Sequence, residues 1–581
     1  RDLQEQLATL QVPDAGKVSA STLHSLCFKV LASEQAFAYT HRIPRPLMQF
    51  EVDCLEQDLA HRFGGKKATR SLLEAYEAAW ARLQREQPGH AVSAEDQEFE
   101  TVLVAWLRFH EAMLIGELVP LTLSFISANP GLPVLPALSN VLVDEFQDLN
   151  RADQALVEAL RAAADILVIG DDNQSIYSFR YAHPEGLRSF PVEMHGTVQY
   201  SITDCRRCPA NIVAVSNALI SHDPHTSRPQ PLVGSNGRPP ADLHIVQHAT
   251  LHEEVQSTAD FIHHVLSERP DLPAGRVMVL APRRFIGNAI KDALIARGRN
   301  ALSYFQEDAL SDEDAAQGFC LLTLLVNPLD RAALRSWLGF GSSDRRHRPY
   351  TRLRDQCESQ GTALHDALTA MSSGGLTIPY TKPLLERWEE LQRRLMELAN
   401  VTGLDLVNAL WPEASQSLTE IRSLAGSIAL DAADNEELLD RLREAITQPE
   451  LPGSDSDIVQ VMSLHKSKGL TRDVVVVAGC MAGTLPFIDS DDRPEVQQAK
   501  YDEQRRLFYV AITRTTEMLV ISAAAALPLR DALRGGATVT RKRFMNGEMH
   551  AITAFSPFIS ELGASAPPAL TTAAWRQQVG I

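Results

Sequence analysis

The stretch that decides the fold is VLVDEFQD, residues 141–148, in which three apolar residues run directly into two carboxylates. The stretch ILVIGDD, residues 166–172, repeats this arrangement, and similar apolar runs occupy residues 277–280, 474–477 and 519–521. Continuous rather than alternating apolar residues are typical of strands buried on both faces of a parallel sheet. Polar residues at the ends of such strands lie where α/β folds bind their ligands. We therefore predict an α/β protein whose functional residues follow its strands.

Helical patterns separate the predicted strands, for example over residues 154–164 and 210–220, as expected for a parallel sheet. Two longer stretches, residues 34–134 and 341–454, show helical patterns alone. The simplest arrangement is two α/β cores, each interrupted by a helical domain. The predicted domains are 1–33 (first core, partial), 34–134 (first helical insert), 135–225 (first core, continued), 226–340 (second core), 341–454 (second helical insert) and 455–581 (second core, continued, with the C-terminal tail).

The composition of the 581 residues is that of a globular protein, with 45% hydrophobic and 22% charged residues, which excludes a mostly disordered chain. A net charge of −18 argues against binding of nucleic acid over the whole surface but permits a local basic channel. No apolar run approaches the ~18 residues that a membrane helix needs. We therefore expect a soluble, cytoplasmic protein without a membrane partner.

The seven cysteines are odd in number and scattered, which predicts no disulfide framework and suits a reducing compartment. Cys205 and Cys208 form one CxxC pair. A zinc site needs four ligands, and neither a second CxxC nor an HxxxH accompanies this pair, so zinc is not expected there.

Two adjacent carboxylates, Asp144 and Glu145, can take two different roles in phosphate hydrolysis. One can hold Mg²⁺, and the other can polarise an attacking water. After the next strand, Gln174 is a neutral group able to contact both a phosphate and a water. The alternative for a bare carboxylate pair is a solvated acidic loop, but the strand before it and the FQD after it favour the catalytic interpretation.

Tyr177, Phe179 and Arg180 combine aromatic faces with a cation. Such a set suits a platform on which unpaired bases stack, worth ~1–3 kcal/mol per base, although both rings could instead belong to the core. Arg206 and Arg514 could stabilise charge on a transferring phosphoryl group. Taken singly, a surface ion pair is the commoner role of an arginine.

The segment SLHKSKGL, residues 463–470, precedes another predicted strand. Its hydroxyl, imidazole, ammonium and glycine groups suit a phosphate cradle for a nucleotide, for a nucleic-acid backbone, or for both. The alternative is a solvated basic loop.

In chain order, the motifs DEFQD, GDDNQSIYSFR, DCRR, LHKSKGL and RRLFYVAITR resemble those of the UvrD/Rep-type superfamily 1 DNA helicases. The resemblance extends to STLHS at residues 21–25 and to LVNP at residues 325–328, and it covers nearly the whole chain. It implies two RecA-like parallel-sheet cores, each interrupted by a mainly helical insert. It further implies that ATP binds between the cores and that single-stranded DNA binds across both.

The same resemblance implies individual roles. Asp144 would hold Mg²⁺, and Glu145 would activate the hydrolytic water. Gln174 would sense the γ-phosphate, which Arg206 and Arg514 would also reach. The implied ATP-binding residues are Gln174, Arg206, Gly469 and Arg514. The residues that match DNA-lining positions are Thr22, His24, Tyr177, Phe179, Arg180, Ser463 and His465.

A protein with these roles would be an ATP-driven motor that moves 3′→5′ on single-stranded DNA and unwinds duplex in replication, repair or recombination. Its partners would be single-stranded DNA and single-strand/duplex junctions in a bacterial nucleoid, with repair or nuclease proteins left open. Two alternatives remain. The chain could be a DNA-binding remnant without motor activity, or a helicase-like subunit of a nuclease or phage-defence complex.

The phosphate-binding loop of that family, G-x-x-x-x-G-K-[ST], does not occur in the 581 residues. In the family this loop lies upstream of the segment that residues 21–25 match, and residues 1–10 resemble the helix that follows the next upstream motif. We therefore expect a fragment that, as given, binds ATP poorly and hydrolyses little. Thr471 stands where the family usually has Glu, which predicts looser nucleotide discrimination, and Cys205 stands where Tyr is usual.

Overall fold

The structure is a computed structural model, and it describes most of the chain. The predicted boundary between residues 134 and 135, and most of residues 1–10, lie outside the described residues. The described residues are 7, 10, 15–84, 93–130, 138–161, 164–226, 230–234, 237–304, 309–413, 418–447, 453–545 and 547–581.

The chain divides into two compact units, each assembled from separate stretches of sequence. Unit 1 consists of Arg1–Val141, Asn150–Leu167 and Glu307–Glu450, and unit 2 consists of Leu142–Leu149, Val168–Gln306 and Leu451–Ile581.

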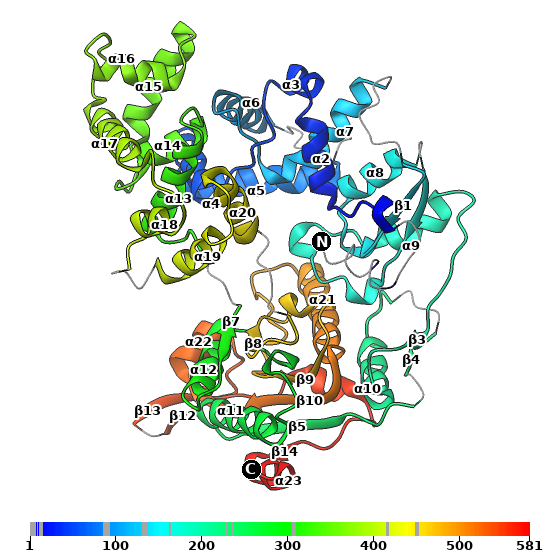
Figure 1. Ribbon diagram of the computed structural model, residues 1–581. Helices are drawn as coiled ribbons and strands as arrows, with labels where there is room; N and C mark the ends of the chain where they lie inside the picture. The colour runs from blue at the N-terminus through cyan, green and yellow to red at the C-terminus, as the bar shows by residue number, and fades with distance from the viewer. Residues whose placement is uncertain are drawn as a thin grey trace. The chain divides into compact units, whose positions relative to one another are not determined.

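Unit 2 is built on a seven-stranded sheet in the order β14-β5-β10-β9-β6-β8-β7 (Figure 1). Every described pairing in this sheet is parallel. The central strands carry the apolar runs 277–280, 474–477 and 519–521, all of them buried, so the prediction for these three runs is confirmed. The strands are β5 (Asp242–His248), β6 (Val277–Leu280), β7 (Ala301–Ser303), β8 (Val459–Met462), β9 (Arg472–Val477), β10 (Thr515–Ala524) and β14 (Leu570–Thr571).

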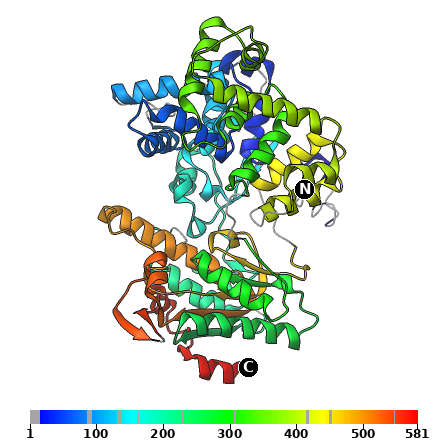
Figure 2. The same cartoon turned by 90° about the vertical axis from the view of Figure 1, so that its left-hand side faces the viewer.

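Helices pack around this sheet in pairs. Helices α11 (Leu251–Glu268) and α12 (Arg284–Ile295) lie side by side (Figures 1 and 2), and α10 (Ala210–Ile220) packs against α21 (Pro494–Ile512). The C-terminal helix α23 (Thr572–Val579) contacts β14 and β5 and buries Trp575. The remaining elements of unit 2 are α9 (Glu185–Glu193), α22 (Leu529–Gly535), the parallel pair β3 (Asp204–Cys205) and β4 (Val233–Gly234), and the antiparallel strands β11 (Ala526–Pro528), β12 (Arg541–Met545) and β13 (Glu548–Ile552).

Unit 1 is mainly helical. In Figure 2 the blue helices near the N-terminus lie beside the green and yellow helices of residues 313–447, and α4 contacts α14 and α15. The predicted domain boundary at residue 340 falls inside this unit, between α14 and α15. The helices are α2 (Leu23–Leu31), α3 (Glu34–Thr40), α4 (Gln49–Ala60), α5 (Lys66–Arg82), α6 (Ala94–Phe109), α7 (Leu118–Ala128), α8 (Arg151–Leu160), α13 (Glu313–Val326), α14 (Arg331–Gly339), α15 (His347–Gln360), α16 (Leu364–Ser372), α17 (Lys382–Leu398), α18 (Gly403–Leu410), α19 (Thr419–Ala429) and α20 (Asn435–Thr447).

A buried ion pair joins the two helical segments of unit 1. Arg335 on α14 is fully buried and donates to both carboxylate oxygens of Asp58 on α4, at 2.8 and 2.5 Å. Asp58 also accepts the indole N–H of Trp106 at 2.9 Å. Because removing one member would leave a buried charge unpaired, this contact specifies how the two segments pack.

A second, two-stranded sheet precedes the carboxylates Asp144 and Glu145. Strands β1 (Asn140–Val143) and β2 (Asp165–Val168) run parallel, because Asp165 N donates to Ser139 O at 3.1 Å and Ile169 N donates to Val143 O at 2.8 Å. Leu142 is 69% exposed and Leu167 is 52% exposed. The prediction that these two runs are buried on both faces is therefore wrong, because no third strand in the described residues pairs with this sheet.

The α/β fold class with parallel sheets and many added helices is confirmed. Across the described ranges, no helix combines the length and the apolarity that crossing a membrane requires.

Candidate functional site

The turn after β1 presents Glu145 in a strained backbone conformation. Its φ is 53°, in the left-handed region that residues other than glycine rarely adopt. The carboxylate of Asp144 accepts the Glu145 N–H at 2.9 Å, and the side-chain amide of Gln147 donates to Glu145 Oε2 at 2.5 Å. The side chains of Phe146 and Gln147 are buried and hold this turn in place. The carboxylates of Asp144 and Glu145 remain exposed. Strain of this kind clusters at functional sites.

Gln147 also joins this turn to the end of β2. Its Oε1 accepts the N–H of Asp171 at 3.0 Å, and Asp171 Oδ2 in turn accepts the side-chain amide of Gln174 at 3.0 Å. A Cβ added to Gly170 would lie 2.6 Å from Gln147 Oε1. A larger residue at this position would displace the Gln147 side chain that joins the two strand ends.

Lys468 ties the loop of residues 463–470 to both strand ends. Its ammonium donates to Asp148 at 2.5 Å and to the carbonyl of Gln174 at 2.7 Å, and it lies 3.4 Å from Glu145 Oε2. Burial raises the pKa of Asp148 to about 6, although the Lys468 charge acts in the opposite direction. The next residue, Gly469, has a φ of 83° with no atom within 4 Å of a would-be Cβ, so the loop leaves open space beside this lysine.

Arg514 enters the same set of contacts from the segment after α21. It is buried, and its guanidinium donates to Val510 O at 2.8 Å and to Gln174 Oε1 at 3.2 Å. Burial, with a smaller contribution from Arg207, lowers the pKa of Arg514 to about 10. Glu145, Lys468, Gln174 and Arg514 thus form one continuous chain of contacts within unit 2. An anion placed there would offset the cost of burying the two cations.

The aromatic residues after β2 gather beside this chain of contacts. The ring of Phe179 lies 5.7 Å from those of Tyr177 and His465, and the Tyr177 hydroxyl donates to the His465 carbonyl at 3.4 Å. The Arg180 guanidinium lies 5.7 and 5.9 Å from the centres of the Tyr177 and Phe179 rings. Phe179 is 60% exposed, so its ring is not part of the core. Burial lowers the pKa of His465, which favours a neutral ring.

Two family profiles match parts of the chain that include these residues. The UvrD/REP helicase N-terminal domain matches residues 133–195, and the UvrD-like helicase C-terminal domain matches residues 378–526. In these two regions the chain is similar to the UvrD/Rep-type superfamily 1 helicases.

Individual relatives agree with the profiles. The ATP-dependent DNA helicase UvrD1 of Mycobacterium tuberculosis is 24% identical over 90% of this chain and 74% of its own length. The DNA helicase II of Escherichia coli is 23% identical over 66% of this chain and 56% of its own length. The ATP-dependent DNA helicase Rep of Escherichia coli is 26% identical over 66% of this chain and 59% of its own length.

The helicase resemblance implies a role for Arg206, whereas in the structure its neighbour Arg207 lies near the buried Arg514. Arg206 is exposed, and no described contact joins it to Gln174 or Arg514. Arg207 is half-buried and acts electrostatically on Arg514. Motif spacing could not distinguish two adjacent arginines, because only the fold decides which side chain turns toward the buried groups.

Thr22 and His24 belong to unit 1, whereas the contacts described above lie within unit 2. Thr22 caps α2 by accepting the N–H of Ser25 at 3.1 Å, and His24 lies exposed on the first turn of that helix. Ser463 lies in unit 2, just after β8, where its carbonyl accepts the N–H of Lys466 at 3.2 Å.

Sequence reasoning left four contributors out of the site: Gln147, Asp148, Lys468 and Arg506. Arg506 donates to the carbonyl of Ser175 at 2.9 Å and to Asp223 at 2.7 Å, which holds the segment after β2 against α21. Lys468 could have been found, because the lysine before a glycine in a predicted phosphate cradle is the natural cation. Gln147, Asp148 and Arg506 carried no signal beyond their place in a motif.

The donor set fits a weakly held Mg²⁺. No group of three metal-binding side chains occurs in the part of the chain that the structure describes. Asp144 is exposed, and its described hydrogen bond uses one carboxylate oxygen. Mg²⁺ commonly takes one or two carboxylates and completes its shell with water and substrate phosphates. Asp144 could therefore hold the ion once a nucleotide supplied the other ligands.

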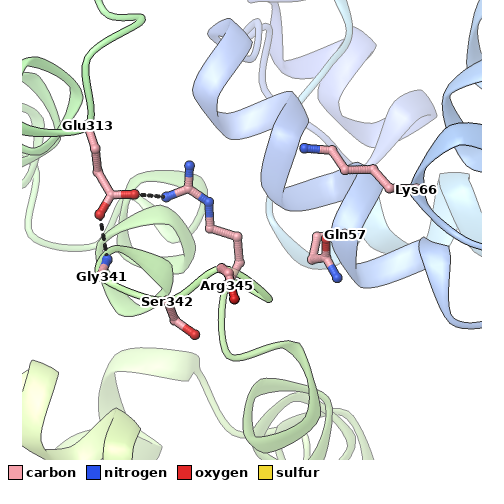
Figure 3. A pocket seen from close by; sticks show the side chains of 7 residues that line it. Gln57, Lys66, Glu313, Gly341, Ser342 and Arg345 are labelled. Atoms are coloured by element: carbon pink, nitrogen blue, oxygen red, sulfur yellow. Dashed lines mark hydrogen bonds and ion pairs between the residues drawn. The ribbon is translucent and has the colours of Figure 1, made fainter.

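Unit 1 contains two pockets that lie elsewhere. One, of about 380 Å³, lies where Gln57 and Lys66 face Glu313 and Arg345 across the two helical segments (Figure 3). The other, of about 610 Å³, includes Arg62 and His347 in its wall. Their linings are largely charged or polar, whereas small-molecule sites are mostly apolar. We therefore interpret both as joints between the segments.

Proposed function

We propose that this protein is an ATP-dependent DNA helicase, in which ATP hydrolysis drives movement along single-stranded DNA and separation of duplex. The observation that carries the proposal is the continuous contact chain of Glu145, Lys468, Gln174 and Arg514. It places one carboxylate base, one amide and two cations beside each other, which is the set that phosphoryl transfer requires. The printed names of the relatives support the same activity.

In this proposal the protein groups divide the chemistry as follows. The Glu145 carboxylate orients a water and accepts its proton, and Asp144 holds Mg²⁺. ATP supplies the phosphoryl group that is transferred to water. Gln174 contacts that phosphoryl group. Because Arg514 donates to Gln174 at 3.2 Å, a movement of Gln174 would also move the Arg514 guanidinium. Lys468 bonds to carboxylates in this structure, so phosphate oxygens would compete with Asp148 and Glu145 for its ammonium.

We propose that the aromatic cluster around the exposed Phe179 is the DNA platform. The rings of Phe179, Tyr177 and His465 with the Arg180 guanidinium offer stacking faces and a cation for unpaired bases. Following the resemblance, Thr22, His24 and Ser463 are also proposed to contact single-stranded DNA. The Lys468 ammonium lies 5.2 Å from the centre of the Tyr177 ring. A movement of Lys468 on nucleotide binding would therefore also displace the platform.

The experiment is an unwinding assay on partial duplexes that carry a 3′ or a 5′ single-stranded tail. The 3′→5′ polarity is inherited from the resemblance, and it predicts unwinding of the 3′-tailed substrate only. Because the 581 residues lack a G-x-x-x-x-G-K-[ST] loop, we expect weak turnover from this chain and full turnover from one completed with such a loop. A completed chain that bound single-stranded DNA without DNA-stimulated ATP hydrolysis would overturn the helicase proposal.

A second candidate is a DNA-binding protein without motor activity. The intact contact chain around Glu145 and Arg514 argues against it. The assay above separates the two, because only the helicase couples DNA binding to ATP turnover.

A further inference from the structure

The cysteine pair Cys205 and Cys208 has no role in the proposed function. Cys205 ends β3, and Cys208 lies two residues before α10. The Cys208 N–H donates to Cys205 Sγ at 3.5 Å. Cys205 is partly exposed, whereas Cys208 is buried. One sulfur is therefore accessible to small reagents, and its partner is held next to it.

The surroundings shift the pKa values of the two thiols in opposite directions. The Cys208 thiol, the backbone N–H groups of Cys208 and Arg207 and the Arg207 charge together lower the pKa of Cys205 to about 5, against the effect of burial. Interaction with the neighbouring Cys205, together with burial, raises the pKa of Cys208. Of the two sulfurs, Cys205 is therefore the one that loses its proton more readily. A thiolate is the reactive form of cysteine, and a neighbouring thiol can resolve its oxidised form.

The other cysteines provide an internal contrast. All five are buried, and burial raises the pKa of each thiol. Buried, protonated thiols are inert, so a mild oxidant should distinguish the CxxC pair from them. These five are Cys27, Cys54, Cys320, Cys357 and Cys480.

We propose that Cys205 and Cys208 form a reversible redox site, in which hydrogen peroxide oxidises Cys205 and Cys208 closes a disulfide. The Cys205 thiolate attacks one peroxide oxygen, the O–O bond breaks, and sulfenic acid and hydroxide form. The Cys208 sulfur then attacks the sulfenic sulfur, the S–S bond forms, and water leaves. The two thiols lose two electrons in all, and the peroxide gains them.

Closing the disulfide changes a contact next to the proposed nucleotide groups. The Cys208 thiol donates to the carbonyl of Thr513 at 3.3 Å, and Thr513 precedes Arg514. A disulfide sulfur has no hydrogen to donate, so oxidation removes this bond and also the thiolate charge beside Arg207. An effect on nucleotide affinity through Arg514 is a consequence that rests on the proposed function, whereas formation of the disulfide does not.

The test oxidises the reduced full chain with hydrogen peroxide, denatures it, alkylates it with N-ethylmaleimide and maps the peptides by mass spectrometry. We expect five of the seven cysteines to remain alkylatable, with the loss confined to the peptide that contains Cys205 and Cys208, and thiol reductants to restore both. Cys208→Ser should stop at a Cys205 sulfenic acid that dimedone traps. Cys205→Ser should resist oxidation, and Cys357→Ala should behave like the unmodified chain at the CxxC pair.

A second measurement does not depend on any variant folding. The rate at which iodoacetamide labels Cys205 should already be high at pH 6, instead of following an ordinary thiol pKa of about 8.5. Seven alkylatable cysteines after peroxide treatment, or labelling that rises only near the ordinary pKa, would overturn the redox site. A disulfide that forms without changing nucleotide affinity would keep the redox site and remove only its link to Arg514.

Discussion

The two-stranded sheet β1–β2 exposes apolar side chains of a kind that the seven-stranded sheet of unit 2 buries. Leu142 in β1 is 69% exposed, whereas Ile521 in β10 is fully buried. The difference lies in the neighbouring strands, because β10 has hydrogen-bonded strands on both sides, whereas β2 is the one strand in the described part of the chain that pairs with β1. An apolar run thus predicts a strand, but its burial depends on partners that the run does not contain.

The chemistry is divided between the same two sheets. The ends of β1 and β2 carry the carboxylates and Gln174, whereas Lys468 follows β8 and Arg514 precedes β10. The small sheet therefore contributes reactive groups with little buried apolar surface, and the large sheet contributes stability and the cations. Four experiments test this division.

The largest effect is expected at the small sheet. In a chain completed with the phosphate-binding loop, Glu145→Gln should lower ATP turnover by roughly 10²–10⁴-fold, because it removes the base and keeps the size. Single-strand DNA binding should be unchanged. Turnover is measured by phosphate release and binding by fluorescence anisotropy, with the exposed Glu495→Gln as the control. Turnover close to that of the unmodified chain would show that another group accepts the proton.

The stability contrast comes next. Ile521→Ala in the centre of the large sheet should lower the free energy of unfolding by about 2–5 kcal/mol, because it leaves a cavity. Leu142→Ala in β1 should change it by less than about 0.5 kcal/mol, because exposed substitutions remove little buried surface. Urea unfolding followed by circular dichroism measures both. Equal losses would mean that β1 is as well covered in solution as β10.

A smaller effect concerns the platform beside the small sheet. Phe179→Ala should weaken single-strand DNA affinity by ~1–3 kcal/mol, the worth of one stacked base. Phe544→Ala is the matched control, because Phe544 in β12 is 68% exposed and Phe179 is 60% exposed. Anisotropy titrations with a labelled oligonucleotide compare them. If both variants bind like the unmodified chain, the Phe179 ring does not stack on bases.

The last effect is a pH dependence where the two sheets meet. Because burial raises the pKa of Asp148 from 3.8 to about 6, the folded state binds this proton more tightly than the unfolded state. The contribution of Asp148 to stability is therefore complete below pH 3.8 and is lost as the pH rises through about 6. Between pH 3.8 and about pH 6, the urea concentration at the unfolding midpoint should fall less steeply with rising pH in Asp148→Asn than in the unmodified chain. Parallel slopes in the two proteins would contradict the raised pKa.

Several features of the site could be predicted from the sequence. The motif order placed Asp144, Glu145, Gln174 and Arg514 in one functional set, and the structure brings the last three into one chain of contacts. The sequence does not tell which of Arg206 and Arg207 lies beside Arg514, or that Lys468 joins the set, because adjacent residues of one motif are equivalent until the fold orients them. The role of Arg206 at the γ-phosphate stays a prediction.

The amino-acid sequence alone determined the α/β class, the central strands of the large sheet and the positions of the carboxylates, because each of these depends on residues that are neighbours in the chain. Tertiary structure alone decided the exposure of β1 and β2, the burial of Arg514 and the unequal thiols of Cys205 and Cys208. The exposure of β1 and β2 depends on which strands pair with them. The environments of Arg514 and of the two thiols depend on burial and on hydrogen-bond partners. Some of these partners come from segments hundreds of residues away, such as the carbonyl of Thr513 for Cys208.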